Sequence, residues 1–112
     1  MTSPAPEWEL ERERAELVAF GRRMGPDGLA IGTGGNLSCR VGDLVAITPR
    51  GVSYEATRLE HICIVGLDGE VVQATLGPSS ELPMHLAVYA RCGAGAVVHT
   101  HSPYATTLGT VI

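Results

Sequence analysis

Two pairs of short β-type segments, each with a glycine and aspartate turn, constrain the fold of this chain most. The first pair is 36–41 and 44–48 around Gly42-Asp43, and the second is 62–65 and 70–73 around Asp68-Gly69. Connections this short join antiparallel neighbours in a sheet. The second pair starts with a continuous apolar run, Ile62-Cys63-Ile64-Val65, which is typical of a strand covered on both faces. We therefore expect a sheet built from hairpins inside a layered domain.

A helical pattern precedes these segments. Sparse apolar residues near helical spacing predict a helix over 8–24, which Gly25-Pro26 ends. Its many Glu and Arg side chains are expected to be solvated or to pair four residues apart. Residues 1–7 are expected to form a flexible tail, so the predicted domain occupies 8–112.

Further elements follow the hairpins. A second helix is expected over 81–91, with Ser79 or Ser80 as its N-cap. Residues 95–101 predict a buried strand, and Ser102-Pro103 predicts the start of another helix. This order of helices and strands predicts an α/β layered domain with antiparallel hairpins in its sheet.

Composition excludes several classes of protein. The 112 residues are 45% apolar and 18% charged, which is typical of a chain that buries a core. No apolar run is long enough to span a membrane, and the first residues do not resemble a secretory signal, so we expect a cytoplasmic protein. Three widely spaced cysteines predict buried thiols and no disulfide framework.

The chain contains no lysine, because all eight basic residues are arginine. Within these residues this excludes a P-loop and any mechanism that uses a lysine Schiff base. The net charge of −4 and the few aromatic residues also disfavour a nucleic-acid surface.

The pattern Val97-Val98-His99-Thr100-His101 is the strongest chemical signal. Histidines at i and i+2 of a strand project from the same face, close enough to bind one metal ion. The alternative is that both histidines are structural. We expect a metal site, because two neutral imidazoles side by side need partners, and because the end of a strand before a helix is where α/β folds gather active sites.

A second pattern is Gly77-Pro78-Ser79-Ser80-Glu81. Hydroxyl groups and free N–H groups at the start of a helix form a site for anions. Plain helix capping is the alternative, with Glu81 as a first-turn acid that favours the helix dipole.

Two loops complete the set of candidate binding segments. The glycine cluster before Asn36 lets the backbone approach a ligand closely, although a flexible loop is an equally good interpretation. The turn at Pro49-Arg50-Gly51 offers the Arg50 guanidinium to a phosphate.

Together these motifs resemble the class II aldolase and adducin family. The matching segments are, in order, GTGGNLS, ITPRGVSYE, LDGEVV, GPSSELPMHLAVY and GAVVHTHSPYAT. The resemblance implies a three-layer α/β/α domain with a mixed, largely antiparallel sheet, of which these residues form the N-terminal half. It also implies a zinc-dependent enzyme of carbohydrate metabolism that assembles as a homotetramer.

The resemblance also assigns site residues. His99 and His101 match two of three zinc-binding histidines, and Glu81 matches the acidic residue beside the metal, which moves a proton and can contact the ion. The phosphate-binding positions match Gly35, Asn36, Gly51, Ser79 and Ser80. Arg50 replaces the usual Ser or Thr, and adds charge or alters the pocket. The third histidine and a catalytic tyrosine of the family lie farther along than these residues reach.

The function that the resemblance implies is cleavage of a sugar phosphate, such as L-fuculose 1-phosphate, into dihydroxyacetone phosphate and an aldehyde. The sequence Ser-Ser-Glu favours an aldolase over the epimerases of the family, which read Ser-Ser-Asp. The alternatives are a sugar-phosphate 4-epimerase or dehydratase of the same fold, and a non-catalytic adducin-like scaffold or truncated inactive product. His61 and His85 are placed outside the site.

Overall fold

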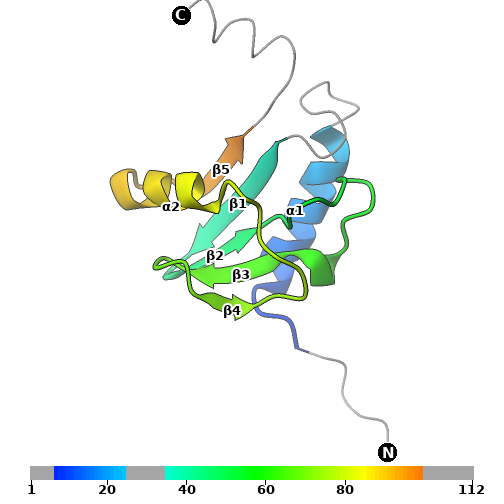
Figure 1. The fold of residues 1–112 in the computed structure, drawn as a ribbon, viewed down its shortest axis with the longest axis horizontal. Helices are drawn as coiled ribbons and strands as arrows, with labels where there is room; N and C mark the ends of the chain where they lie inside the picture. Colours follow the sequence, from blue (N-terminus) through cyan, green and yellow to red (C-terminus); the bar gives the residue numbers. More distant parts are fainter. Residues whose placement is uncertain (1–6, 25–34, 100–112) are drawn as a thin grey trace, which may run out of the picture.

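The computed structural model describes residues 7–24 and 35–99 (Figure 1). These residues form, in chain order, α1 (Glu11–Met24), β1 (Asn36–Val41), β2 (Leu44–Ile47), the 3-10 helix η1 (Leu59–His61), β3 (Cys63–Gly66), β4 (Val71–Gln73), α2 (Leu82–Arg91) and β5 (Ala96–His99). None of the helices in these ranges is long and apolar enough to cross a membrane. Residues 1–6 of the predicted tail and the predicted helix after Ser102 lie outside the described residues.

The strands form one sheet in the order β4-β3-β2-β1-β5. Each neighbouring pair within the described ranges is antiparallel, which agrees with the expected largely antiparallel sheet. Strand β5 comes last in sequence yet pairs with β1, which brings residues about sixty positions apart into register. This pairing carries the end of β5 to the start of β1.

Both predicted hairpins are present, with strand ends within one residue of expectation. In the first turn Gly42 has a φ of 60°, and in the second Gly69 has a φ of 87°. Glycine adopts this left-handed backbone without a steric penalty, which explains its place at both turns. The predicted doubly covered strand is confirmed, because residues 62–65 are all buried.

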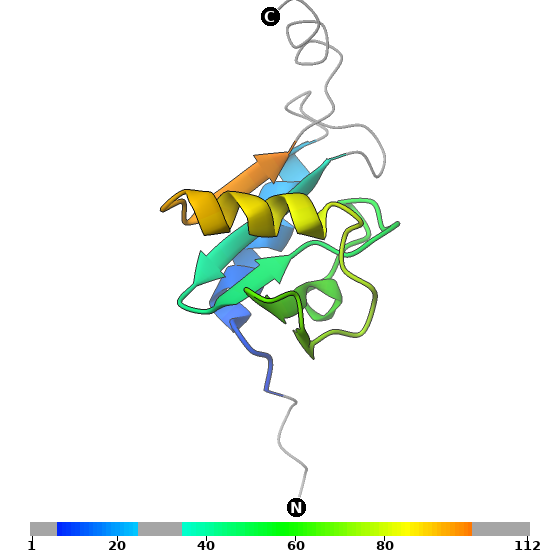
Figure 2. The same ribbon diagram turned by 60° about the vertical axis from the view of Figure 1, so that its left-hand side comes forward.

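Helices α1 and α2 cover opposite faces of the sheet, as the two views show (Figures 1 and 2). The core on the α1 face contains Leu17, Met24, Leu37, Ala46, Tyr54, Ile62 and Ile64. The core on the α2 face is smaller, and its fully buried members are Val45, Val65 and Tyr89. Neighbouring strand residues alternate between the two cores, as the period of two requires. The expected three-layer arrangement is therefore confirmed.

Helix α1 differs from the prediction in one important respect. It begins at Glu11, and Arg12 pairs with Glu16 four residues along as expected, and also with the nearly buried carboxylate of Glu13. The side chain of Arg14, however, is completely buried. The expectation that the charged side chains of this helix are solvated or pair four residues apart is therefore wrong for Arg14 and for Glu13, which is also buried.

The buried guanidinium of Arg14 joins α1 to the far end of the sheet. It donates to the carbonyl oxygens of Glu9 at 2.7 Å, Leu59 at 3.1 Å and Ile62 at 2.6 Å, and to Gln73 Oε1 at 2.8 Å. The Cζ atom of the guanidinium also lies 5.0 Å from the centre of the Trp8 ring. Hydrogen bonds to several neutral acceptors spread the charge and offset the cost of burying it.

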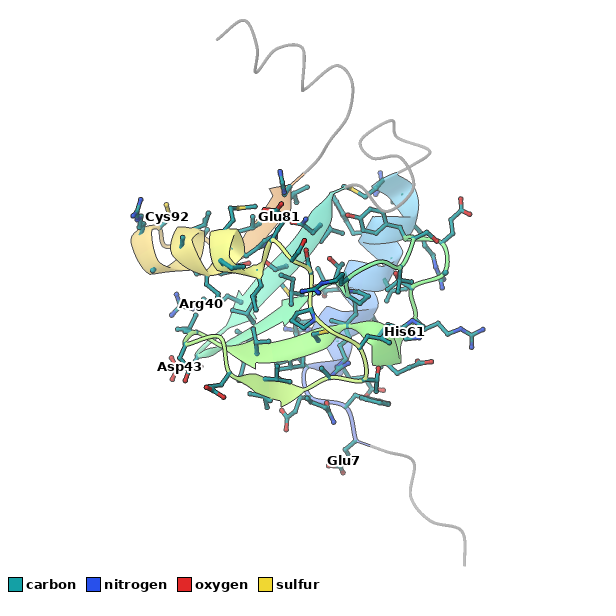
Figure 3. All side chains as sticks on the ribbon, viewed as in Figure 1. Glu7, Arg40, Asp43, His61, Glu81 and Cys92 are labelled. Atoms are coloured by element: carbon teal, nitrogen blue, oxygen red, sulfur yellow. The ribbon has the colours of Figure 1, made fainter. Side chains whose placement is uncertain are left out.

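Two smaller expectations are corrected. The N-cap position of α2 is Glu81, not Ser79 or Ser80, although Ser79 Oγ accepts a hydrogen bond from the Glu81 N–H at 3.2 Å. Of the three thiols expected to be buried, Cys63 is buried, Cys39 is partly buried and Cys92 is exposed at the far end of α2 (Figure 3). Burial raises the pKa of the Cys39 and Cys63 thiols to about 11, so neither is a reactive thiolate at neutral pH.

We predict that Arg14→Met lowers the free energy of unfolding by about 3 kcal/mol, because it leaves several buried carbonyl groups without a donor. Urea unfolding followed by circular dichroism measures the change. The matched control is Arg12→Met in the same helix, where the side chain is 82% exposed and the stability should stay unchanged. Equal effects of the two substitutions would contradict the role given to Arg14.

Candidate functional site

The two loops predicted to bind an anion lie side by side. The Arg50 N–H donates to the Gly77 carbonyl oxygen at 2.9 Å, and the Ser79 N–H donates to the Thr48 carbonyl oxygen at 3.0 Å. These two bonds flank an isolated bridge between Pro49 and Pro78. Segments nearly thirty residues apart in sequence thus form one backbone unit in front of α2.

The start of β1 joins the same unit. The Leu37 N–H donates to Thr48 Oγ1 at 3.2 Å, and the Thr48 N–H donates to the Leu37 carbonyl oxygen at 3.0 Å. Asn36 therefore lies next to the loop that carries Arg50 and Gly51. Three of the segments predicted from sequence to bind phosphate converge at the N-terminal end of α2.

The predicted phosphate-binding residues divide into two groups. Ser79 is buried, and its N–H and Oγ already make hydrogen bonds to Thr48 and Glu81. Arg50, Gly51 and Ser80 are exposed, and no described residue accepts a hydrogen bond from the N–H of Gly51 or Ser80. Ser79 thus shapes the loop, while Gly51, Ser80 and the Arg50 side chain remain open to a ligand.

Two of these positions need a left-handed backbone. Gly35 has a φ of 85° and Gly51 a φ of 72°. A Cβ atom at Gly51 would meet nothing within 4 Å, so glycine is required there by its backbone conformation and not by crowding. The conformation turns the N–H of a loop residue in a direction that a regular strand does not allow.

His99 closes the site on the β5 side. It is the register partner of Asn36, and directly opposed residues in an antiparallel pair share a face. Asn36 is on the α2 face, because its side chain contacts His85 of that helix. The His99 ring and the Glu81 carboxylate both act on the charge of His85, which places both near the first turns of α2.

The predicted metal ligands are only partly covered by the structure. His99 ends β5, and Glu81 lies at the start of α2, at the opposite end of that helix from Cys92 (Figure 3). His101 lies outside the described residues, so the predicted pair on one strand face stays a prediction. Within residues 7–24 and 35–99, no group of three or more His, Cys, Asp or Glu side chains is arranged to hold a metal ion.

His85, which was placed outside the site, contacts one of the predicted phosphate-binding residues, Asn36. The ring is fully buried, with Nδ1 2.6 Å from Ser38 Oγ and Nε2 in a short hydrogen bond to Asn36 Oδ1. Ser38 Oγ also lies 2.8 Å from the Tyr89 hydroxyl. The sequence signal that could have found this network is the spacing of Glu81, His85 and Tyr89, which puts all three on one face of a helix.

Burial, together with a smaller effect of the nearby His99, lowers the pKa of His85 to about 4, while Glu81 opposes the shift. The imidazole is thus neutral at pH 7 and has one N–H to donate. The other excluded histidine, His61, is also not free, because its Nδ1 accepts a hydrogen bond from the Arg58 N–H at 3.0 Å. That bond caps η1, so His61 has the structural role expected of it.

The described residues form an α/β domain in which unpaired backbone N–H groups and an exposed arginine lie at the same end of α2 as a carboxylate and an imidazole. A family model described as the class II aldolase and adducin N-terminal domain matches residues 15–112. The chain belongs to the class II aldolase and adducin family.

Known relatives support this membership. A 5-deoxy-D-ribulose 1-phosphate aldolase of Bacillus thuringiensis serovar kurstaki is 50% identical over 105 residues, which cover 91% of this chain and 49% of the relative. An L-ribulose-5-phosphate 4-epimerase of Salmonella paratyphi B is 45% identical over 82 residues, 70% of this chain and 36% of the relative. The solved structure of an L-fuculose 1-phosphate aldolase is 36% identical with a TM-score of 0.83, over 87% of this chain and 47% of that one. The chain thus spans half or less of the length of these relatives.

We predict that the His85 ring is still neutral at pH 5.5 in the folded protein. The native state binds the proton only near pH 4, whereas the unfolded state binds it near pH 6.5. The contribution of His85 to stability is therefore complete above pH 6.5 and falls by up to about 3 kcal/mol as the pH drops towards 4. An NMR titration of the ring protons measures the midpoint, and a value at or above 6.5 would contradict the buried network.

Proposed function

We propose that this chain carries the phosphate-binding and proton-transfer half of a metal-dependent class II aldolase that cleaves a sugar phosphate, such as L-fuculose 1-phosphate. The observation that supports this most is the position of Glu81. It is the N-cap residue of α2, between the anion-binding loops and the end of the strand that carries His99. A bound phosphate would thereby place the sugar carbons within reach of a carboxylate.

The phosphate would be held at the N-terminal end of α2. The unpaired N–H groups of Gly51 and Ser80 are donors, and the partial positive charge of the helix end favours a dianion. The exposed Arg50 side chain adds a full positive charge. At this position the family usually has Ser or Thr. The arginine of this chain would strengthen phosphate binding and narrow the entrance to the phosphate site.

Glu81 would move the proton in the cleavage step. When the bond between the carbonyl-bearing fragment and the aldehyde fragment breaks, its electron pair forms an enediolate, and the hydroxyl proton of the aldehyde fragment has to leave. The enediolate then takes up a proton to become dihydroxyacetone phosphate. A carboxylate that faces both fragments can accept the first proton and return the second.

The metal would be bound by His99, His101 and Glu81. Imidazole nitrogen and carboxylate oxygen are ligands that zinc accepts, and the closeness of His99 and Glu81 to His85 fits a shared site. A divalent cation, when bound, supplies the positive charge that stabilises an enediolate in a chain that has no lysine. Assembly into homotetramers and a cytoplasmic location also stay predictions.

A sugar-phosphate 4-epimerase is the second candidate, because one relative with that name is 45% identical over 82 residues. Both reactions would use the same phosphate and metal positions. The products separate them, since only an aldolase releases dihydroxyacetone phosphate.

We predict that the purified chain binds about one zinc ion, with two imidazoles and a carboxylate as its ligands. Replacing His99 and His101 together should abolish binding, measured as bound metal after dialysis. The control His61→Ala changes a histidine that caps η1 and should retain the metal. Unchanged metal content in the double variant would overturn the proposed site.

We predict that Glu81→Gln reduces metal-dependent release of dihydroxyacetone phosphate by about 10² to 10⁴, the usual loss on removing a proton-transfer group. A coupled assay on L-fuculose 1-phosphate measures the rate. Glu55→Gln, at an exposed position in the loop after β2, is the control and should keep the wild-type rate. Equal rates for Glu81→Gln and the wild type would contradict the role of Glu81.

A further inference from the structure

Four polar side chains between α2 and the sheet are nearly inaccessible to solvent. The exposed fractions are 6% for Asn36, 1% for Ser38, 0% for His85 and 3% for Tyr89. Burying a polar group lowers the stability of the fold unless the group is hydrogen-bonded. A buried polar network in place of an apolar core therefore indicates a role beyond packing. Of the four, only Asn36 is among the residues that the family resemblance assigns to phosphate binding.

The hydrogen bonds of this network have one consistent direction. Asn36 Oδ1 can only accept, so His85 Nε2 must carry the hydrogen. A neutral imidazole has a single N–H, so His85 Nδ1 accepts, and the donor is the Ser38 hydroxyl at 2.6 Å. Ser38 Oγ in turn accepts from the Tyr89 hydroxyl at 2.8 Å. The direction of donation runs from Tyr89 through Ser38 and His85 to Asn36.

In this arrangement the Nε2–H tautomer of His85 and the orientation of the Asn36 carboxamide depend on each other. Turning the amide over would put its NH₂ group against the His85 Nε2–H, two donors facing each other in a buried space. With Oδ1 bound to His85, the NH₂ group keeps its two hydrogens for another acceptor. No described residue accepts a hydrogen bond from it.

We propose that His85 is a positioning residue, which holds the Asn36 carboxamide so that its NH₂ group donates to the phosphate of the ligand. The inference rests on the proposed function, because it adds the Asn36 amide to the proposed phosphate site. His85 itself is buried beneath Asn36 and does not contact the ligand. Its contribution is to keep the amide in the binding orientation before the ligand arrives. Binding then loses less side-chain conformational entropy, and the affinity is higher.

The first test is the tautomer of His85 in the wild-type protein. The ring ¹⁵N signals at pH 7 are expected to show a protonated Nε2 and an unprotonated Nδ1. An Nδ1–H tautomer would mean that the Asn36 amide is turned over, with its NH₂ group on His85, and would overturn the proposal. This measurement requires no variant and no ligand.

The second test is binding of inorganic phosphate by calorimetry. We expect His85→Phe and Asn36→Ala each to weaken binding by about tenfold, the effect of one lost hydrogen bond. The double variant should bind no more weakly than either single one, because both remove the same interaction. His85→Gln, whose amide N–H can replace Nε2–H, should recover most of the affinity and also serves if His85→Phe does not fold.

The outcomes separate the two claims. Loss of affinity in Asn36→Ala with none in the folded His85 variants would overturn the positioning role and leave the phosphate site intact. Additive losses in the double variant would also overturn it, because His85 would then act on affinity through the structure at large. A wild-type protein that does not bind phosphate would overturn the proposed phosphate site and, with it, this inference.

Discussion

The two hydrogen bonds of the His85 ring tie helix α2 to strand β1, and the geometry of the candidate site depends on that tie. Both partners, Asn36 and Ser38, lie on the same face of one strand. The apolar core under α2 is small, so the polar contacts carry much of the specificity with which the helix is placed. A helix that slid by one turn would lose both bonds and would move Glu81 away from the loops.

The strands and hairpins were predictable because their signals are local. A glycine and aspartate turn between two β-type segments predicts both that the segments pair and that they are antiparallel. The continuous apolar run of residues 62–65 predicts a strand buried on both faces. The convergence of the anion-binding segments was predictable only from the family resemblance. Nothing local in the Arg50 turn indicates that it pairs with Gly77.

The roles of buried polar residues were not predictable from the same signals. Arg14 belongs to a run of charged residues that a solvated helix face would also produce, and its four acceptors come from distant segments and the turn before α1. His85 was placed outside the site, and its partners come from a strand about fifty residues earlier, which no local pattern indicates. Ser79 was expected to cap α2 and bind phosphate, yet its N–H is committed to a loop that becomes a neighbour only in the folded chain.

The central claim is that the loops before α2, together with the start of β1, form one phosphate-binding site. The most direct measurement is an NMR titration of the backbone amides and the asparagine side chain with inorganic phosphate. The account predicts saturable shifts at Gly51 and Ser80 and at the Asn36 NH₂ group, with small shifts at the Asp68-Gly69 turn. Shifts spread evenly over the arginine-bearing surface, or absent from Gly51 and Ser80, would contradict it.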